Sequence, residues 1–380
     1  MNFSFTEEQL ALQDTLQRFV AKDYTFEKRQ QFMAGPDGFS RDAWNTYAEL
    51  GILALPFPEE FGGLNGTALD IYLTMRALGT GLTLEPYVGT VILCGDLIKR
   101  LANAEQKASV IPQICDGTLM LALAHYEPQS RYRESAIDAH AVRNGDNWTL
   151  QGHKAVVLGA ASANQLLLSA RTSGQAGAED GISLFLVPAD TIGLAFRRYA
   201  CHDGTRAADI VLNDVVVGAH ALLGPEGQAF PAIMQAIALT NVALTAEATG
   251  IMQALNAATL DYLKTRKQFG VALSSFQALQ HRLADMAIAT EQADSMALLA
   301  AIEMGSADFA ACVQRASGAK TFVGQKARLV GQDAIQMHGG IGVTDELIVG
   351  HYFKRLAVIN SLFGDLDFHL QRYSDMILPA

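Results

Sequence analysis

The 380-residue sequence is poor in cysteine and has no cluster of basic residues. Its four cysteines lie far apart and form no CxxC pair: Cys94, Cys115, Cys201 and Cys312. This spacing argues against a disulfide framework or a zinc site and is typical of buried thiols in a reducing cytoplasm. The net charge of −11 and the lack of a basic run argue against nucleic acid as a partner. We therefore expect a cytoplasmic protein without a bound metal.

Charged residues are missing altogether from positions 227–246. Gln235, Thr240 and Asn241 interrupt this stretch, so we expect a helix buried within protein and no membrane span. Its uncharged face also leads us to expect a partner chain. At the N-terminus, early acidic residues and the lack of a basic-then-apolar order predict that there is no signal peptide.

Hydrophobic periodicity divides the chain into three blocks. Helical spacing begins after Thr6, a predicted N-cap, and is interrupted by a Pro- and Gly-rich loop at 56–66. Alternating patterns then predict strands, including a hairpin that turns at 144–146. Long helical runs follow over 232–265, 274–303 and 308–337. The predicted fold class is α+β, with an N-terminal helical domain (1–120), a middle β domain (121–228) and a C-terminal four-helix bundle (229–380).

Two glycine-containing motifs lie in the C-terminal block. RKQFG (266–270), followed by FQALQHRLADM (276–286), is either a helix end with favourable cations or a loop whose arginine and amides hold a phosphate. QMHGGIG (336–342) lacks the preceding strand and the spacing of a dinucleotide-binding turn, which excludes that type of site. Its adjacent glycines predict a helix end and allow a ligand to approach the backbone closely.

Together with the three-block order, these motifs resemble those of the acyl-CoA dehydrogenase family. The resemblance covers nearly the whole chain, because the loop PFPEEFGG and the EP pair of HYEP also match. It implies FAD as cofactor, an acyl-CoA thioester as substrate, a homo-oligomer or heterotetramer, and electron-transfer flavoprotein as electron acceptor. In the implied reaction a carboxylate removes the proton α to the thioester carbonyl, and flavin N5 accepts a hydride from the β carbon.

The resemblance also assigns residues to the cofactor. Those expected to face FAD directly are Arg266, Gln268, Phe269 and Gln277. Those expected to approach the FAD of a neighbouring chain are Gln336, Gly339 and Gly340. Tyr126 and Leu158 occupy flavin-contacting positions that are usually threonine in the family, so the flavin surroundings differ from the usual pattern.

The usual catalytic glutamate is absent from both of its family positions. Near the C-terminus the family usually has Tyr-Glu-Gly-Thr, whereas this chain reads Leu362-Phe363-Gly364-Asp365. The other usual position, on the first long C-terminal helix, is Thr240. The sequence therefore places an uncharged residue at each site where a base is expected.

Two nearby acids are candidate bases. Asp365 lies two residues beyond the usual glutamate position, and its alternative role is to cap the last helix. Glu247 lies about two helical turns beyond Thr240 on the same face. Its alternative role is an ion pair or hydrogen bond within the bundle, because an isolated buried charge is costly.

The pattern FGDxDxH, with RKQFG and AEATG, is most similar to the small subunits of bacterial two-subunit acyl-CoA dehydrogenases, of the pimeloyl-CoA dehydrogenase small subunit type. The first hypothesis is an FAD-dependent acyl-CoA dehydrogenase, active alone or as one subunit of a heteromer. The alternative is a non-catalytic subunit that supports FAD or the assembly. A flavin oxidase is a third possibility.

Overall fold

The computed structural model describes residues 5–378, and within them the chain forms two compact units. We call the first the helical unit; it contains residues 5–31, 67–83 and 241–378. We call the second the sheet unit; it contains residues 32–66 and 84–240. The helices predicted for the N-terminal block are therefore divided between the two units.

The N-terminal helices that begin in the helical unit are α1 (Glu7–Asp23), α2 (Phe26–Ala34) and α4 (Ala68–Thr80). The predicted N-cap of α1 is confirmed, because the Thr6 hydroxyl accepts a hydrogen bond from Gln9 N at 3.2 Å. The Gln9 side chain in turn accepts one from Thr6 N at 3.1 Å. This reciprocal pair satisfies two backbone donors that a helix start leaves without partners.

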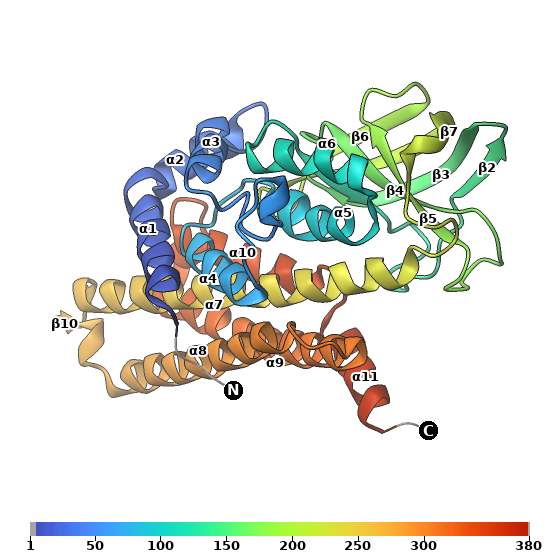
Figure 1. Cartoon of the computed structure of the whole chain (residues 1–380). Coiled ribbons are helices and arrows are strands. Elements are labelled where there is room, and N and C mark those ends of the chain that lie inside the picture. The colour runs from blue at the N-terminus through green and yellow to red at the C-terminus, as the bar shows by residue number, and fades with distance from the viewer. Residues whose placement is uncertain (1–4, 379–380) are drawn as a thin grey trace. The chain divides into compact units, whose positions relative to one another are not determined.

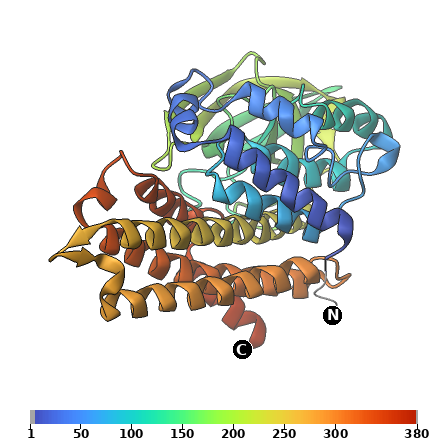
Figure 2. The same ribbon diagram turned by 90° about the vertical axis from the view of Figure 1, so that its left-hand side faces the viewer.

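The C-terminal part of the described chain is built from α7 (Phe230–Thr265), α8 (Gln277–Glu303), α9 (Phe309–His338), α10 (Ile348–Ser361) and α11 (Leu366–Ile377). The first three confirm the long predicted helical runs. Helix α9 is central, since it packs against α8, α10 and α11 (Figure 1). Helix α11 is thus an addition to the expected four-helix bundle. Between α7 and α8, strands β9 (Lys267–Gln268) and β10 (Val271–Ala272) form a short hairpin that projects beyond the helix ends (Figure 2).

Helix α7 contains the uncharged stretch noted in the sequence. Its residues 236–252 are all buried, as expected for a helix inside protein. Because the chain itself covers this segment, the uncharged face gives no evidence for a partner chain. No helix within residues 5–378 is both long enough and apolar enough to cross a membrane.

Two glycines let α4 and α7 approach each other within the helical unit. A Cβ added at Gly250 would lie 2.0 Å from the carbonyl oxygen of Arg76 on α4. Reciprocally, a Cβ at Gly79 would lie 2.4 Å from the carbonyl oxygen of Glu247 on α7. Neither position has room for a side chain. This close contact explains why the long α7 contains a glycine and fixes the backbone that carries Glu247.

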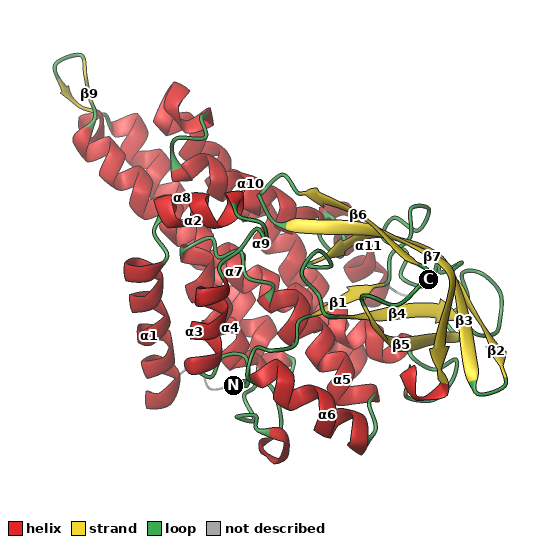
Figure 3. Ribbon diagram, turned by 90° about the horizontal axis from the view of Figure 1, so that it is seen from above, coloured by secondary structure: helices red, strands yellow, loops and turns green. Residues whose placement is uncertain are grey.

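The sheet unit contains helices α3 (Arg41–Glu49), α5 (Gly95–Leu101) and α6 (Ala104–Cys115) around one sheet. Its strands are β1 (Leu121–Ala124), β2 (His140–Asn144), β3 (Asn147–Leu158), β4 (Gln165–Arg171), β5 (Ile182–Pro188), β6 (Leu194–Ala200), β7 (Arg206–Gly218) and β8 (Leu222–Leu223). The strand order is β6-β7-β3-β2-β4-β5-β8, and β1 pairs with β4 in parallel (Figure 3).

The predicted hairpin is confirmed as β2–β3, in which Asn144 pairs with Asn147 across the turn. Strands β4 and β5 are buried along nearly their whole length, which matches their continuous apolar sequences. The pairing of β3 with β7 is irregular between Lys154 and Val157. There Val156 adopts a left-handed backbone with φ of 53° and donates its N–H to Asp209 Oδ1 at 3.1 Å. This bulge interrupts the ladder, which resumes with the pairs Val157–Ala208 and Leu158–Ala207.

Candidate active site

The helical unit brings the two glycine motifs of the C-terminal block into one pocket with a volume of about 510 Å³. We call it the motif pocket. Five residues predicted to bind the cofactor line it: Arg266, Gln268, Gln336, Gly339 and Gly340. They come from segments about seventy positions apart, so the fold supplies a proximity that the sequence does not show. We treat this pocket as the candidate cofactor site of the helical unit.

The walls of the motif pocket are held by backbone hydrogen bonds. Arg266 N donates to Tyr262 O at 2.8 Å, and Leu273 N donates to Arg266 O at 2.9 Å, which closes the loop on both sides of the β9–β10 hairpin. Opposite this loop, helix α9 ends at His338, and the next residue, Gly339, has a φ of 64° that suits glycine. A Cβ at Gly339 or Gly340 would meet no atom within 4 Å, so the turn leaves open space beside the pocket.

Tyr262 and His338 also line the pocket, and sequence reasoning did not identify either of them. Their rings stack with centroids 4.4 Å apart, and the Tyr262 hydroxyl donates to His338 O at 3.3 Å. Burial lowers the pKa of His338, although its contact with Ala334 O acts in the opposite direction. The neutral ring therefore carries its proton on Nδ1 and donates it to Ala334 O. This stacked pair joins the end of α7 to the glycine turn.

Phe269 and Gln277 do not line the motif pocket. Phe269 lies in the turn of the hairpin with φ of 55°, is 91% exposed and meets Phe276 edge-on with ring centroids 6.2 Å apart. Gln277 is the exposed first residue of α8. The single chain thus presents these two side chains on its surface, outside the pocket formed by the other predicted cofactor residues.

Tyr126, which follows β1, and Leu158, at the end of β3, both belong to the sheet unit. The carbonyl of Tyr126 accepts a hydrogen bond from Ala155 N at 2.8 Å, which fixes the segment after β1 beside the bulge in β3. Leu158 is the last residue of β3 and pairs with Ala207 on β7. Both side chains are half-buried. The fold therefore gathers the two predicted flavin positions of the sheet unit around one bulge.

The glutamate of the EP pair has a structural role next to this bulge. Glu127 and Lys154 form a buried ion pair of 2.7 Å, with Lys154 fully buried. Glu127 also accepts hydrogen bonds from Asp138 N at 2.8 Å and from Ala139 N at 3.0 Å. Burial acts to raise the pKa of Glu127, but the Lys154 ammonium and the backbone donors outweigh it, and the net pKa lies below its usual value. The carboxylate therefore stays ionised and ties β3 to the segment that leads into β2.

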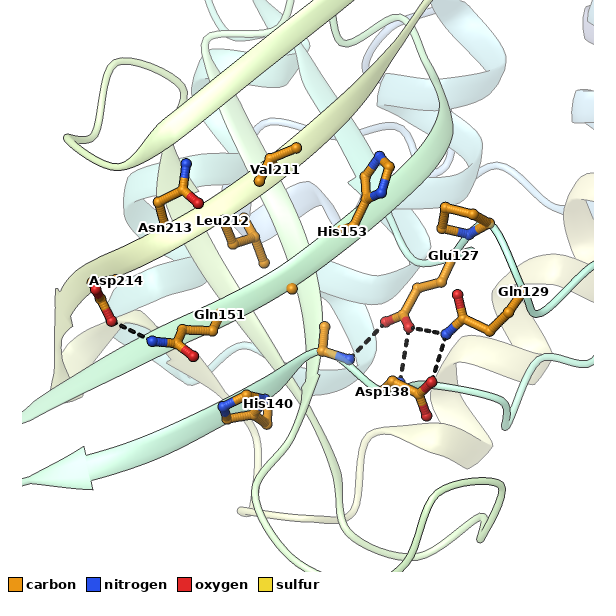
Figure 4. A pocket seen from close by; sticks show the side chains of 13 residues that line it. Glu127, Gln129, Asp138, His140, Gln151, His153, Val211, Leu212, Asn213 and Asp214 are labelled. Carbon is orange, nitrogen blue, oxygen red and sulfur yellow. Dashed lines mark hydrogen bonds between the residues drawn. The ribbon is translucent and has the colours of Figure 1, made fainter.

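A surface pocket of about 740 Å³ lies above this ion pair. In Figure 4, the amide of Gln129 donates to Glu127 Oε2 and to Asp138 Oδ2, each at 2.8 Å. His140 and His153 are exposed along the same opening. The polar groups at its base thus bond to one another and complete the support of Glu127.

Glu247, the first of the two candidate bases to be considered, is engaged by an arginine. It lies on α7, is 5% exposed, and accepts from Arg355 Nε at 2.6 Å and from Arg355 Nη2 at 2.8 Å. A two-point contact of this kind is a strong charge-assisted interaction and uses both carboxylate oxygens. The geometry is that of the ion pair considered as its alternative role, and it joins α7 to α10.

Asp365, the second candidate base, is the N-cap of α11. Its Oδ1 accepts a hydrogen bond from Phe368 N at 2.9 Å. It follows two residues with positive φ, Phe363 at 53° and Gly364 at 117°. A Cβ at Gly364 would lie 2.5 Å from His369 Nε2, so only glycine fits there. The sequence alternative for Asp365, a helix cap, is therefore present, and the carboxylate lies on the same loop as the usual family base.

Two residues that the sequence analysis did not identify hold this loop by hydrogen bonds to its carbonyl groups. Lys320, on α9, is 2% exposed and donates to Leu362 O at 2.5 Å, to Gly364 O at 3.3 Å and to Asn241 Oδ1 at 3.3 Å. His369, on α11, contacts Phe363 O through Nε2 at 3.0 Å. Helix α9 also carries Lys326 and Arg328, so the sequence does not set Lys320 apart from other lysines and arginines.

The residues of the motif pocket fit FAD in their chemistry. A guanidinium and two side-chain amides supply charged and polar donors for phosphate and ring edges. Adjacent glycines at the end of α9 leave open space in which a ligand reaches the backbone. When bound, FAD supplies the hydride acceptor for dehydrogenation. Arg266, Gln268, Gln336, Gly339 and Gly340 are the residues of this pocket that would hold it.

Sequence models of one protein family match three consecutive parts of the chain. They describe the acyl-CoA dehydrogenase N-terminal domain at residues 6–118, the middle domain at 122–215 and the C-terminal domain at 227–377. Together these matches cover most of the sequence in the order expected for the family.

Individual relatives agree with the domain matches. A probable acyl-CoA dehydrogenase of Bacillus subtilis, YngJ, is 32% identical over 91% of both chains, and the mitochondrial isobutyryl-CoA dehydrogenase of Dictyostelium discoideum is 30% identical over 94% of this chain and 86% of its own. The butyryl-CoA dehydrogenase structure from Megasphaera elsdenii superposes with a TM-score of 0.91 at 25% identity, covering 99% and 100% of the chains. A chain from a structural study of the electron transferring flavoprotein of Acidaminococcus fermentans gives a TM-score of 0.92 at 28% identity over 100% of both chains. The chain belongs to the acyl-CoA dehydrogenase family of FAD-dependent oxidoreductases, which dehydrogenate acyl-CoA thioesters.

Proposed function

We propose that this chain performs α,β-dehydrogenation of an acyl-CoA thioester with its FAD held by the motif pocket. The observation that carries the proposal is the meeting of RKQFG and QMHGGIG in that pocket. Arg266 would contribute a charge-assisted hydrogen bond, and Gln268 and Gln336 would contribute amide donors and acceptors. Phe269, Gln277, Tyr126 and Leu158 belong to the proposed cofactor surroundings through the family resemblance.

The proposed base is Asp365, with Glu247 second. Both oxygens of Glu247 are bound to Arg355, so removing a substrate proton would require this buried ion pair to open. Asp365 is half-buried and lies on the loop where the family usually carries its base. Its reach is one methylene shorter than that of glutamate, so proton transfer at hydrogen-bond distance requires a loop backbone that stands about one ångström further inward than in relatives that carry glutamate.

The test is anaerobic mixing of the purified yellow protein with a panel of acyl-CoA thioesters, followed by flavin absorbance. Loss of flavin absorbance with at least one thioester is the expected result. A protein that binds FAD but keeps its absorbance with every thioester, including branched and dicarboxylyl forms, would contradict the proposal.

One observation favours a second candidate, a non-catalytic subunit that supports FAD or the assembly. Each candidate base has a structural partner in the chain: Arg355 for Glu247, and the start of α11 for Asp365. In that case a larger homologous subunit of a heterotetramer supplies the base. Co-purification with such a subunit, and activity only in its presence, distinguish this candidate from the first.

The same proposal extends to the oligomeric state, the electron acceptor, the cellular location and the domains of the chain. Most of the predicted cofactor side chains of the helical unit are exposed in the single chain, which suits a cofactor site completed by a second chain in a homo- or heterotetramer. Electron-transfer flavoprotein is the proposed electron acceptor. All four cysteines are free thiols, which supports a cytoplasmic location. We also propose three domains, at 1–120, 121–228 and 229–380.

A further inference from the structure

The loop that carries the proposed base has an unusual set of backbone partners. Three successive carbonyls, those of Leu362, Phe363 and Gly364, each accept a hydrogen bond from a buried side chain. Lys320 serves the first and third, and His369 serves the second. Loops usually satisfy such groups with water or with their own backbone. Here buried side chains of the helical unit hold the loop at each of the three residues before Asp365.

The backbone of this loop requires such support. Phe363 adopts a left-handed conformation that a residue with a Cβ disfavours, and Gly364 adopts a φ of 117°. A strained conformation of this kind persists only where its surroundings over-determine it. Lys320 spans the strained residues, since its ammonium contacts the carbonyls on both sides of Phe363.

The partners of Lys320 and His369 show which nitrogen atoms donate to the loop. The contact of His369 Nε2 with a carbonyl requires a proton on that nitrogen, so Nδ1 accepts from the Ser317 hydroxyl at 3.2 Å. Lys320 Nζ faces carbonyl and amide oxygens; burial lowers its pKa to about 7, and the Asp365 carboxylate acts in the opposite direction. Burial, Lys320 and Arg372 together lower the pKa of His369 to about 3. The Lys320 amine and one neutral ring thus donate hydrogen bonds to the loop.

We propose that Lys320 is a positioning residue: it fixes the backbone of the loop 362–365 and thereby sets where the Asp365 carboxylate stands relative to the substrate. The inference rests on the proposed function, in which Asp365 is the base. Lys320 contacts no reacting group itself, and it acts through the loop. Asn241 Oδ1 accepts a hydrogen bond from Lys320, so α7 also contributes to this support.

The test uses Lys320→Met, which keeps an unbranched apolar stem and removes every donor, with Lys326→Met as matched control. Lys326 lies on the same helix, is half-buried and contacts the Phe322 ring instead of the loop. Hydrogen exchange of the peptide spanning 362–368 is measured at saturating FAD. Exchange at least about tenfold faster in Lys320→Met alone is expected, because loop opening becomes easier. Unchanged exchange would overturn the inference whether or not the protein is active.

A second readout separates positioning from general support of the fold. At unchanged FAD content, Lys320→Met is expected to slow flavin reduction by acyl-CoA at least about tenfold while the thioester dissociation constant stays within about threefold. Equal loss of thioester affinity and rate, or loss of FAD, would overturn the positioning role. If Lys320→Met does not fold, His369→Asn loosens the same loop at Phe363 and takes its place.

The outcomes keep the two proposals apart. Faster exchange in a protein whose flavin no thioester reduces supports Lys320 as the support of the loop and refutes the proposed function. Flavin reduction that is normal in Lys320→Met despite faster exchange refutes the positioning role and leaves the proposed function standing.

Discussion

At the scale of single residues, the chain separates groups that hold the fold from groups that face a ligand. Glu127 and Lys154 are buried together and bind each other, whereas Arg266 is exposed and lines the motif pocket. Substitution of the buried pair should therefore change stability, and substitution of Arg266 should change cofactor binding. The sequence predicted Arg266 from its motif, but Lys154 and Lys320 were missed, because a single lysine within an apolar pattern does not reveal its partner.

Arg266→Ala should weaken FAD binding by one to two decades, because a charge-assisted hydrogen bond contributes about 1.5–3 kcal/mol. Lys267→Ala is the matched control: it removes the same charge from the next residue, which does not line the motif pocket. FAD titration of the apoprotein measures both dissociation constants. Equal effects of the two substitutions would show that net charge, and not the pocket, governs binding.

Glu127→Gln should lower the free energy of unfolding by about 3–5 kcal/mol, because it leaves the Lys154 ammonium buried without a carboxylate. Glu226→Gln, on the exposed loop before α7, serves as control. Urea unfolding at saturating FAD provides the measurement. A stability equal to that of the wild type would refute the role assigned to this pair.

At the scale of elements, long periodic patterns were predictable and contacts between elements were not. Helices α7, α8 and α9 follow the predicted runs closely, and the β2–β3 hairpin turns where expected. Strands β1, β4 and β6 were not predicted individually, since a short or continuously apolar segment has no distinctive period. The role of Gly250 was also hidden, because its explanation is the backbone of α4, far away in the sequence.

Gly250→Ala tests the α4–α7 contact. Alanine favours a helix by about 1 kcal/mol, but overpacking costs about 1–3 kcal/mol and here meets a backbone oxygen, so we expect a net loss of about 2 kcal/mol in the free energy of unfolding. Gly305→Ala is the control, because its nearest atom would lie 3.7 Å away. The measurement is the midpoint of urea unfolding of each variant, compared with that of the wild type. Stabilisation by Gly250→Ala would contradict the close contact.

At the scale of the whole molecule, buried neutral histidines link stability to pH. Burial lowers the pKa of His125 to about 3, and burial together with Lys320 and Arg372 lowers that of His369 to about 3. The unfolded chain binds these protons below about pH 6.5, and the folded chain does not bind them until about pH 3. Protonation thus favours the unfolded state, and the free energy of unfolding falls as the pH drops through this window.

Each such histidine should cost about 1.4 kcal/mol per pH unit between about pH 6 and pH 4. In His369→Asn the slope of stability against pH should be smaller than in the wild type by about one proton. Urea unfolding at several pH values measures both slopes. Parallel slopes in the two proteins would show that His369 is protonated in the folded state.

The central claim is that this family member dehydrogenates acyl-CoA with Asp365 as base, and the most direct measurement is the anaerobic rate of flavin reduction in the wild type and in Asp365→Asn. Asparagine caps a helix as well as aspartate does, so this variant keeps the start of α11 and loses only the proton acceptor. We expect the wild-type flavin to be reduced by at least one acyl-CoA, and Asp365→Asn to be slower by about 10²–10⁴-fold with FAD still bound. A wild-type rate in Asp365→Asn, or a wild-type flavin that no acyl-CoA reduces, would contradict the claim.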